Sequence, residues 1–169
     1  YAVLSIARDD SATRAPASGR PCAGGRAVVG GYTEGCSVLV SVADLAVMAA
    51  TLAGGGTNPI TGVEVFSRVA SRQVLSVMLT CGMYDNAGDW VSDVGLPAKS
   101  GVGGGIIAGL PSRFGVASYA PQLDLHGNSV RGTLFFERLS ADFALHMLDG
   151  VEPRDLEECA RELMDAGTH

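Results

Sequence analysis

One short stretch of the sequence combines residue types that could act on a carbonyl substrate, namely Lys99-Ser100-Gly101. A lysine and a hydroxyl at a strand edge can face a nucleophile, and the glycine leaves room for substrate beside the strand. Backbone N–H groups there can also point at a developing oxyanion. Lys99 is the only lysine of the chain. A surface strand that carries a solvated lysine is the alternative interpretation of so short a stretch.

Two tyrosines stand where a phenol could donate or move a proton. Tyr84 follows Gly82, which we expect to end a helix, so its hydroxyl can project into a cleft. Tyr32 lies four residues before Cys36. For both tyrosines, a ring packed at a helix end is the alternative. Cys36 and Cys81 have no neighbouring His or Lys in the sequence, which favours inert thiols over nucleophiles.

Composition and charge exclude several classes of protein. The formal net charge is −6 and no dense Lys/Arg block occurs, which argues against nucleic acid or an anionic membrane surface as partner. No apolar run reaches the roughly 18–20 residues that a membrane span requires. The His and Cys residues show no metal-ligand spacing, so we expect no metal. The scattered cysteines are typical of reduced thiols and predict a cytoplasmic location.

Capping signals and hydrophobic periodicity indicate the elements that must position these residues. Ser41 with Asp44 is a capping-box pattern and predicts a helix that ends before Gly54. The remaining expected elements are a helix over 69–81, strands over 91–96, 103–110 and 114–119, a long helix over 129–148 and a helix over 155–166. This order predicts an α+β fold, with helices on one face of an antiparallel sheet.

Taken together, the motifs resemble the glutaminase family, serine-dependent amidohydrolases of the β-lactamase/penicillin-binding-protein-like fold. The resemblance covers about residues 32–148 and rests on stretches that come in the family's order and spacing. These stretches are Met48 to Ala53, Asn58-Pro59-Ile60-Thr61-Gly62, Cys81-Gly82-Met83-Tyr84, Gly95 to Val102, Pro121, Leu123-Asp124 and Gly127-Asn128-Ser129.

The resemblance implies hydrolysis of L-glutamine to L-glutamate and ammonia without metal or cofactor, in a homo-oligomer. It assigns Tyr32 and Tyr84 to glutamine binding, and Tyr84 also to proton movement during acylation. The backbone N–H of Val102 would bind the substrate amide oxygen, and Lys99 and Ser100 would support the site. Residues 32–149 would form the C-terminal part of the catalytic domain and 150–169 a helical extension, whereas 1–31 read as irregular and unlike the family.

One departure from the family pattern limits what this chain could do alone. The family's nucleophile and base come from a Ser-x-x-Lys helix start, and with Lys99 as the only lysine the serine would have to stand at Leu96. We therefore expect a truncated or fragmentary chain that needs an N-terminal half to be active. A catalytically inactive binding or assembly remnant of the same fold is the alternative.

Overall fold

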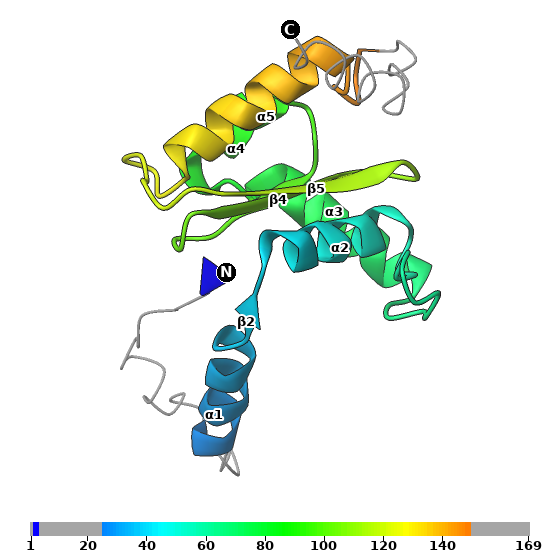
Figure 1. Ribbon diagram of the computed structural model, residues 1–169, viewed down its shortest axis with the longest axis vertical. Coiled ribbons are helices and arrows are strands. Elements are labelled where there is room, and N and C mark those ends of the chain that lie inside the picture. Colours follow the sequence, from blue (N-terminus) through cyan, green and yellow to red (C-terminus); the bar gives the residue numbers. More distant parts are fainter. Residues whose placement is uncertain (1, 4–24, 150–169) are drawn as a thin grey trace, which may run out of the picture.

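A computed structural model describes residues 2–3 and 25–149, and two antiparallel sheets organise them (Figure 1). One pairs β1 with β2, and the other has the strand order β3-β4-β5. In chain order the elements are β1 (Ala2–Val3), α1 (Gly25–Cys36), β2 (Leu39–Val40), α2 (Val42–Ala53), α3 (Arg68–Cys81), the 3₁₀ turn η2 (Tyr84–Asn86), α4 (Ala87–Asp93), β3 (Ala98–Ser100), β4 (Gly105–Leu110), β5 (Phe114–Tyr119) and α5 (Val130–Phe143).

Local capping chemistry sets the ends of α2 and α3, as predicted. The Ser41 hydroxyl accepts from the Asp44 N–H at 3.2 Å, and the Asp44 carboxylate accepts from the Ser41 N–H at 2.7 Å. This reciprocal capping box satisfies two N–H groups that the first turn of a helix otherwise leaves unpaired. Gly54 follows the end of α2 and Gly82 follows the end of α3. The strands predicted over 103–110 and 114–119 are confirmed as β4 and β5, which pair as an antiparallel hairpin.

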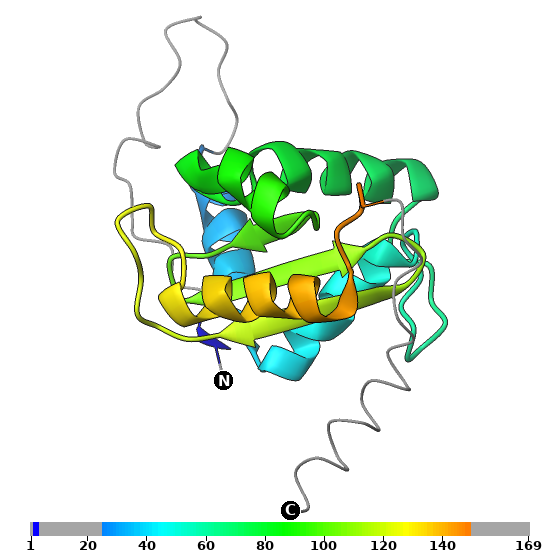
Figure 2. The same cartoon turned by 90° about the horizontal axis from the view of Figure 1, so that it is seen from above.

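Helices cover both faces of the three-stranded sheet, which corrects the expectation of one covered face. Figure 1 shows α4 and α5 on one side of the sheet and α2 on the other. A β-carbon at Gly115 of β5 would overlap the backbone of Ala50, so α2 lies directly against the strand. From above, α5 lies over the sheet and α3 runs beside it (Figure 2). Both faces of β4 are apolar, and each therefore needs a cover.

The predicted strand over 91–96 is wrong, because most of this apolar run belongs to helix α4 and the turn after it. Ala87, Trp90 and Val94 recur at helical spacing and are all buried, whereas Asp89 and Asp93 face solvent. A short run of apolar residues fits a strand and a buried helix equally well, and the packing decides between them.

The main core lies between the sheet and the pair α4 and α5. The Trp90 and Phe136 rings meet edge to face, with their centroids 5.5 Å apart, and the Trp90 indole N–H donates to the Leu96 carbonyl at 2.8 Å. The buried members of this cluster are Met83, Ala87, Trp90, Val94, Leu96, Ala98, Ile106, Ala108, Leu110, Phe136 and Leu145. Met83 therefore anchors the segment before Tyr84 in the core.

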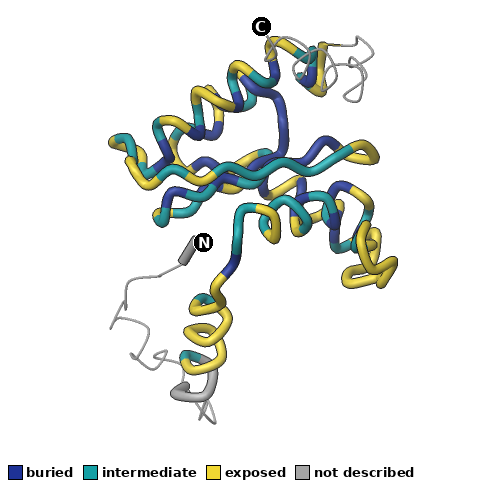
Figure 3. Tube along the Cα trace, viewed as in Figure 1, coloured by how far each residue is buried: buried dark blue, intermediate teal, exposed yellow. Residues whose placement is uncertain are grey.

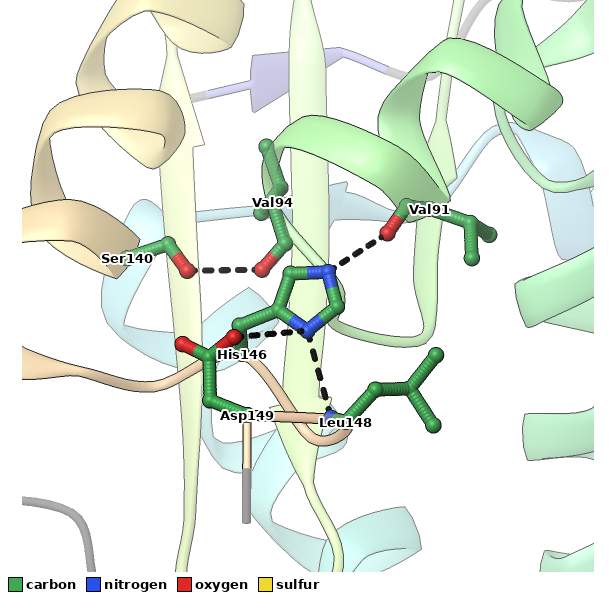
Figure 4. A network of polar contacts seen from close by, with 6 residues as sticks. All are labelled: Val91, Val94, Ser140, His146, Leu148 and Asp149. Atoms are coloured by element: carbon green, nitrogen blue, oxygen red, sulfur yellow. Dashed lines mark hydrogen bonds and ion pairs between the residues drawn. The ribbon is translucent and has the colours of Figure 1, made fainter. Parts of the chain in front are cut away.

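A polar network fastens the end of α5 to α4 (Figure 4). The helix ends at Phe143, before the expected Leu148, because Ala144 adopts a left-handed backbone conformation with φ 52°. The Ser140 hydroxyl donates to the Val94 carbonyl at 2.7 Å. His146 Nε2 lies 2.8 Å from the Val91 carbonyl, and Nδ1 accepts from the Leu148 N–H, so the proton sits on Nε2.

Residues 25–31, expected to be irregular, form the first part of α1. The glycines there suggested a loop, but the Thr33 hydroxyl donates to the Val29 carbonyl at 2.7 Å, as a helical turn allows. The helix expected over 155–166 lies outside the described residues. Within the described part of the chain, no helix is both long and apolar enough to cross a membrane.

The close contact between α3 and β3 generates a stability prediction. A β-carbon at Gly82 would overlap the Ala98 carbonyl oxygen, so Gly82→Ala must push the helix end away from the strand. We expect a loss of about 3 kcal/mol in the free energy of unfolding, measured by urea denaturation. Gly88→Ala is the control, because no atom lies within 4 Å of its new methyl group. Equal stability of the two variants would contradict this packing.

The capping box generates a prediction about acid stability. Hydrogen bonds from the Ser41 hydroxyl and then from the Ser41 N–H hold the pKa of the Asp44 carboxyl below its usual value. The stabilisation is therefore present at neutral pH and is lost as the pH falls through that lowered pKa. Between about pH 7 and pH 3, the melting temperature of Asp44→Asn should fall by less than that of the wild type. Identical curves for Asp44→Asn and the wild type would refute the assignment.

Candidate active site

The turn after α3 holds Tyr84 in an unusual backbone conformation. Gly82 closes the helix by donating its N–H to the Met78 carbonyl at 2.9 Å, and Met83 is 1% exposed. Tyr84 then takes φ 55°, in the left-handed region that bulky residues avoid. Such a conformation persists only where the surroundings determine it, and it is most frequent at functional sites.

Strand β3 brings Lys99 to Tyr84. The strand is joined to the end of α3, because the Ser100 N–H donates to the Gly82 carbonyl at 3.0 Å. The Lys99 Nζ lies 4.4 Å from the centroid of the Tyr84 ring, an arrangement in which the ring face attracts a cation. Residues 84 and 99 are thus neighbours, as a shared site requires.

Ser100 contributes its backbone carbonyl to this cluster. The Tyr84 hydroxyl donates to the Ser100 carbonyl at 3.2 Å, and the Lys99 ammonium donates to the same oxygen. The Ser100 hydroxyl is buried and has no hydrogen-bond partner within the described residues. Side chains alternate along a strand, so the Ser100 side chain faces away from Lys99. Ser100 therefore supports the cluster through its main-chain carbonyl and not through its hydroxyl.

The loop after β3 presents two unused backbone donors. The Val102 and Gly103 N–H groups make no hydrogen bond within the part of the chain that the structure describes, while the Gly101 and Gly104 N–H groups are both paired. Val102 is 56% exposed. A β-carbon at Gly127 would lie 3.7 Å from the Tyr84 ring and 4.0 Å from a Val102 methyl group, so the two residues border one patch of surface.

This patch offers donors and no nucleophile. The Lys99 ammonium keeps further N–H groups and the Val102 N–H is unpaired, and such donors stabilise a developing negative charge on oxygen, whereas the single proton of the Tyr84 hydroxyl is donated to the Ser100 carbonyl. Cys81 is exposed, but its thiol lies 3.2 Å from the Val77 carbonyl, and no base stands beside it in the sequence. Across residues 25–149, no three His, Cys, Asp or Glu side chains gather as a metal site would need.

Tyr32 lies apart from the other predicted site residues. It stands on α1, which projects away from the three-stranded sheet (Figure 1). Its side chain is 62% exposed, and most of the neighbouring residues 29–36 are exposed with it (Figure 3). The structure thus brings Tyr84, Lys99, Ser100 and Val102 together and leaves Tyr32 outside.

Asn128 is a residue that its motif alone did not single out. It is completely buried, and its amide Nδ2 donates to the Met83 carbonyl at 3.3 Å, directly before Tyr84 in the chain. The sequence signal was its place between Gly127 and the helix-capping Ser129, which marks a turn but says nothing about a contact 45 residues away.

The hydrogen bond between Tyr84 and Ser100 generates a prediction. Tyr84→Phe removes one donor to the Ser100 carbonyl, but the Lys99 ammonium still donates to that oxygen. We therefore expect a loss of at most about 1 kcal/mol in unfolding free energy, measured by chemical denaturation. Ser140→Ala, which leaves the buried Val94 carbonyl without its hydroxyl partner, should cost more. A loss of unfolding free energy in Tyr84→Phe that exceeds the loss in Ser140→Ala would show that the phenol mainly stabilises the fold.

Comparisons with known proteins place these residues in one family. The Glutaminase family model matches residues 24–148, which begins before Tyr32. Glutaminase 1 of Bradyrhizobium diazoefficiens is 57% identical over 123 residues, which are 73% of this chain and 20% of that protein. The glutaminase of Microcystis aeruginosa is 52% identical over 126 residues, 74% of this chain and 37% of that protein.

Solved structures give the same result. Mglu in its glutamate form matches with a TM-score of 0.70 at 52% identity, over 76% of this chain and 29% of that one. The probable glutaminase ybaS matches with a TM-score of 0.71 at 40% identity, over 75% of this chain and 41% of that one. The chain thus spans about a fifth to two-fifths of the length of these proteins.

Proposed function

Because the chain belongs to the glutaminase family, we propose that it supplies the tyrosine and oxyanion side of a site that hydrolyses L-glutamine to L-glutamate and ammonia. It has an α+β architecture that is part of the β-lactamase-like fold. The observation that carries the proposal is that Tyr84, beside Lys99, and Val102, whose N–H is unpaired, border one patch. The glutamate form of Mglu supports the choice of substrate, since glutamate is the product of that reaction.

In this proposal each group has one task in the acyl transfer. A serine hydroxyl attacks the side-chain amide carbon of glutamine, and the Val102 N–H donates to the oxygen that becomes negatively charged. A base beside the serine takes the serine proton, and the Tyr84 hydroxyl relays that proton to the departing nitrogen, which leaves as ammonia. Water then attacks the ester, which releases glutamate and returns a proton to the serine oxygen. Lys99, beside the Tyr84 ring, adds positive charge near the developing oxyanion. Tyr32 would help to bind glutamine.

The serine and its base must come from residues beyond this sequence. No Ser-x-x-Lys occurs in it, and the Ser100 hydroxyl is buried on the other side of β3. The chain alone is therefore proposed to be inactive, and an N-terminal half supplied as a separate chain would complete the site.

Exposed apolar side chains favour a second candidate function, that of an assembly module. Val74 and Val77 are 43% and 59% exposed on α3, and Ile60 and Val63 are 75% and 58% exposed on the preceding loop. Val74 and Val77 stand three residues apart on the same side of α3, and an exposed apolar helix side is typical of contact with another chain. A homo-oligomer would use it. The free thiols of Cys36 and Cys81 support a cytoplasmic location for either function, because reducing compartments keep cysteines unpaired.

Complementation tests the proposed activity. The purified chain alone should release no ammonia from glutamine. A mixture of the chain with the N-terminal part of the Microcystis aeruginosa glutaminase should release ammonia. In that mixture Tyr84→Phe should lower kcat by about 100-fold, because proton transfer loses its positioned group.

Tyr119→Phe, an exposed tyrosine on β5, is the control and should keep the wild-type rate. An active mixture in which both tyrosine variants behave alike would remove Tyr84 from the mechanism. Self-association without any activity in the mixture would favour the assembly module.

A further inference from the structure

Asn128 is locked in place by the turn that precedes α5. The Asp124 carboxylate accepts from the His126 N–H at 2.8 Å and from the Asn128 N–H at 2.9 Å. The Asp124 N–H in turn donates to the Asn128 carbonyl at 2.8 Å. Both backbone groups of Asn128 are therefore paired within the turn, and its side chain is 0% exposed. An amide held in this way can act as a rigid donor.

The group that this amide contacts is the peptide that precedes Tyr84. The Met83 carbonyl accepts from Asn128 Nδ2 at 3.3 Å and from the Asn86 N–H at 3.2 Å. Rotation of the Met83–Tyr84 peptide about the Tyr84 N–Cα bond is the motion that would relieve its positive φ. Two donors on one carbonyl oppose that motion, and one of them comes from 45 residues away. The turn after α3 itself supplies only the other donor, the Asn86 N–H.

The buried amide is only half satisfied. Asn128 Oδ1 has no hydrogen-bond partner among the described residues, although it is shielded from water. A buried polar atom without a partner is costly, so packing alone would favour an apolar side chain at this position. The Nδ2 donor is the feature that an apolar residue of similar size would lack.

We propose that Asn128 is a positioning residue for Tyr84, which holds the phenol over Lys99 by fixing the Met83 carbonyl. The geometric part of this proposal concerns the described chain alone. Its consequence for catalysis rests on the proposed function, because Tyr84 must take part in the reaction for its position to matter.

Fluorine NMR of the full chain tests the geometric part. The chain is labelled with 3-fluorotyrosine, and the Tyr84 signal is assigned by its loss in Tyr84→Phe. Asn128→Asp keeps the size of the side chain but replaces the donor with a carboxylate, so the Tyr84 signal should move toward its position in the unfolded chain at pH 7. It should return as the pH falls and the carboxyl regains a proton that can be donated.

Two further variants keep this test decisive. Asn128→Ala carries no charge, so it should remain folded where a buried carboxylate does not, and its Tyr84 signal should be displaced at every pH. Asn58→Ala is the matched control, because Asn58 Oδ1 also holds a turn, by accepting from the Ile60 and Thr61 N–H groups. Its Tyr84 signal should match the wild type. An unchanged Tyr84 signal in both Asn128 variants, or an equal displacement in Asn58→Ala, would overturn the proposal.

The complemented enzyme tests the catalytic consequence. Asn128→Ala should lower kcat by on the order of 10-fold, while KM stays within about twofold, because a misplaced group loses transition-state contact before substrate binding. If wild-type mixtures show no activity, the proposed function fails, and the NMR result still decides the positioning role. A normal kcat with a displaced Tyr84 signal would confine Asn128 to a structural role and overturn its part in catalysis.

Discussion

The joint between the end of α3 and strand β3 is the contact on which the rest of this structure depends. The helix end approaches the strand so closely that only glycine fits at Gly82, and the Ser100 N–H closes the gap with a hydrogen bond to the Gly82 carbonyl. The same joint sets the distance between the phenol of Tyr84 and the ammonium of Lys99. Fold and candidate site are thus two results of one close approach.

Local signals in the sequence were sufficient wherever local chemistry decides the outcome. The reciprocal bonds of Ser41 and Asp44 join residues three apart, and the start of α2 was therefore predictable. The apolar run over 91–96 favours a strand when it is considered alone, because the helix that contains most of it depends on packing of Trp90 against Phe136, a contact between residues 46 apart. The covering of both sheet faces depends in the same way on contacts that no short window contains.

In the candidate site too, some features follow from the sequence and others depend on contacts between distant segments. The grouping of Tyr84, Lys99 and Val102 follows from a resemblance between motifs, and the structure gives it a geometry. The positive φ of Tyr84 and the burial of Asn128 could not be read from sequence, since they arise from the meeting of the turn after α3 with the turn before α5. For Tyr32 the motif and the structure differ. The motif groups Tyr32 with the other site residues, whereas α1 holds its exposed side chain away from the three-stranded sheet.

The carbonyl of Ser100 has a consequence for how this site tolerates mutation. Tyr84 and Lys99 both donate to a main-chain oxygen, and every residue type that could replace Ser100 carries the same oxygen. The acceptor is therefore encoded by the path of the strand and by its register against β4, in which Ser100 pairs with Ile106. Point substitutions at this position can change the packing beneath the strand, whereas only an insertion or deletion would carry the acceptor away.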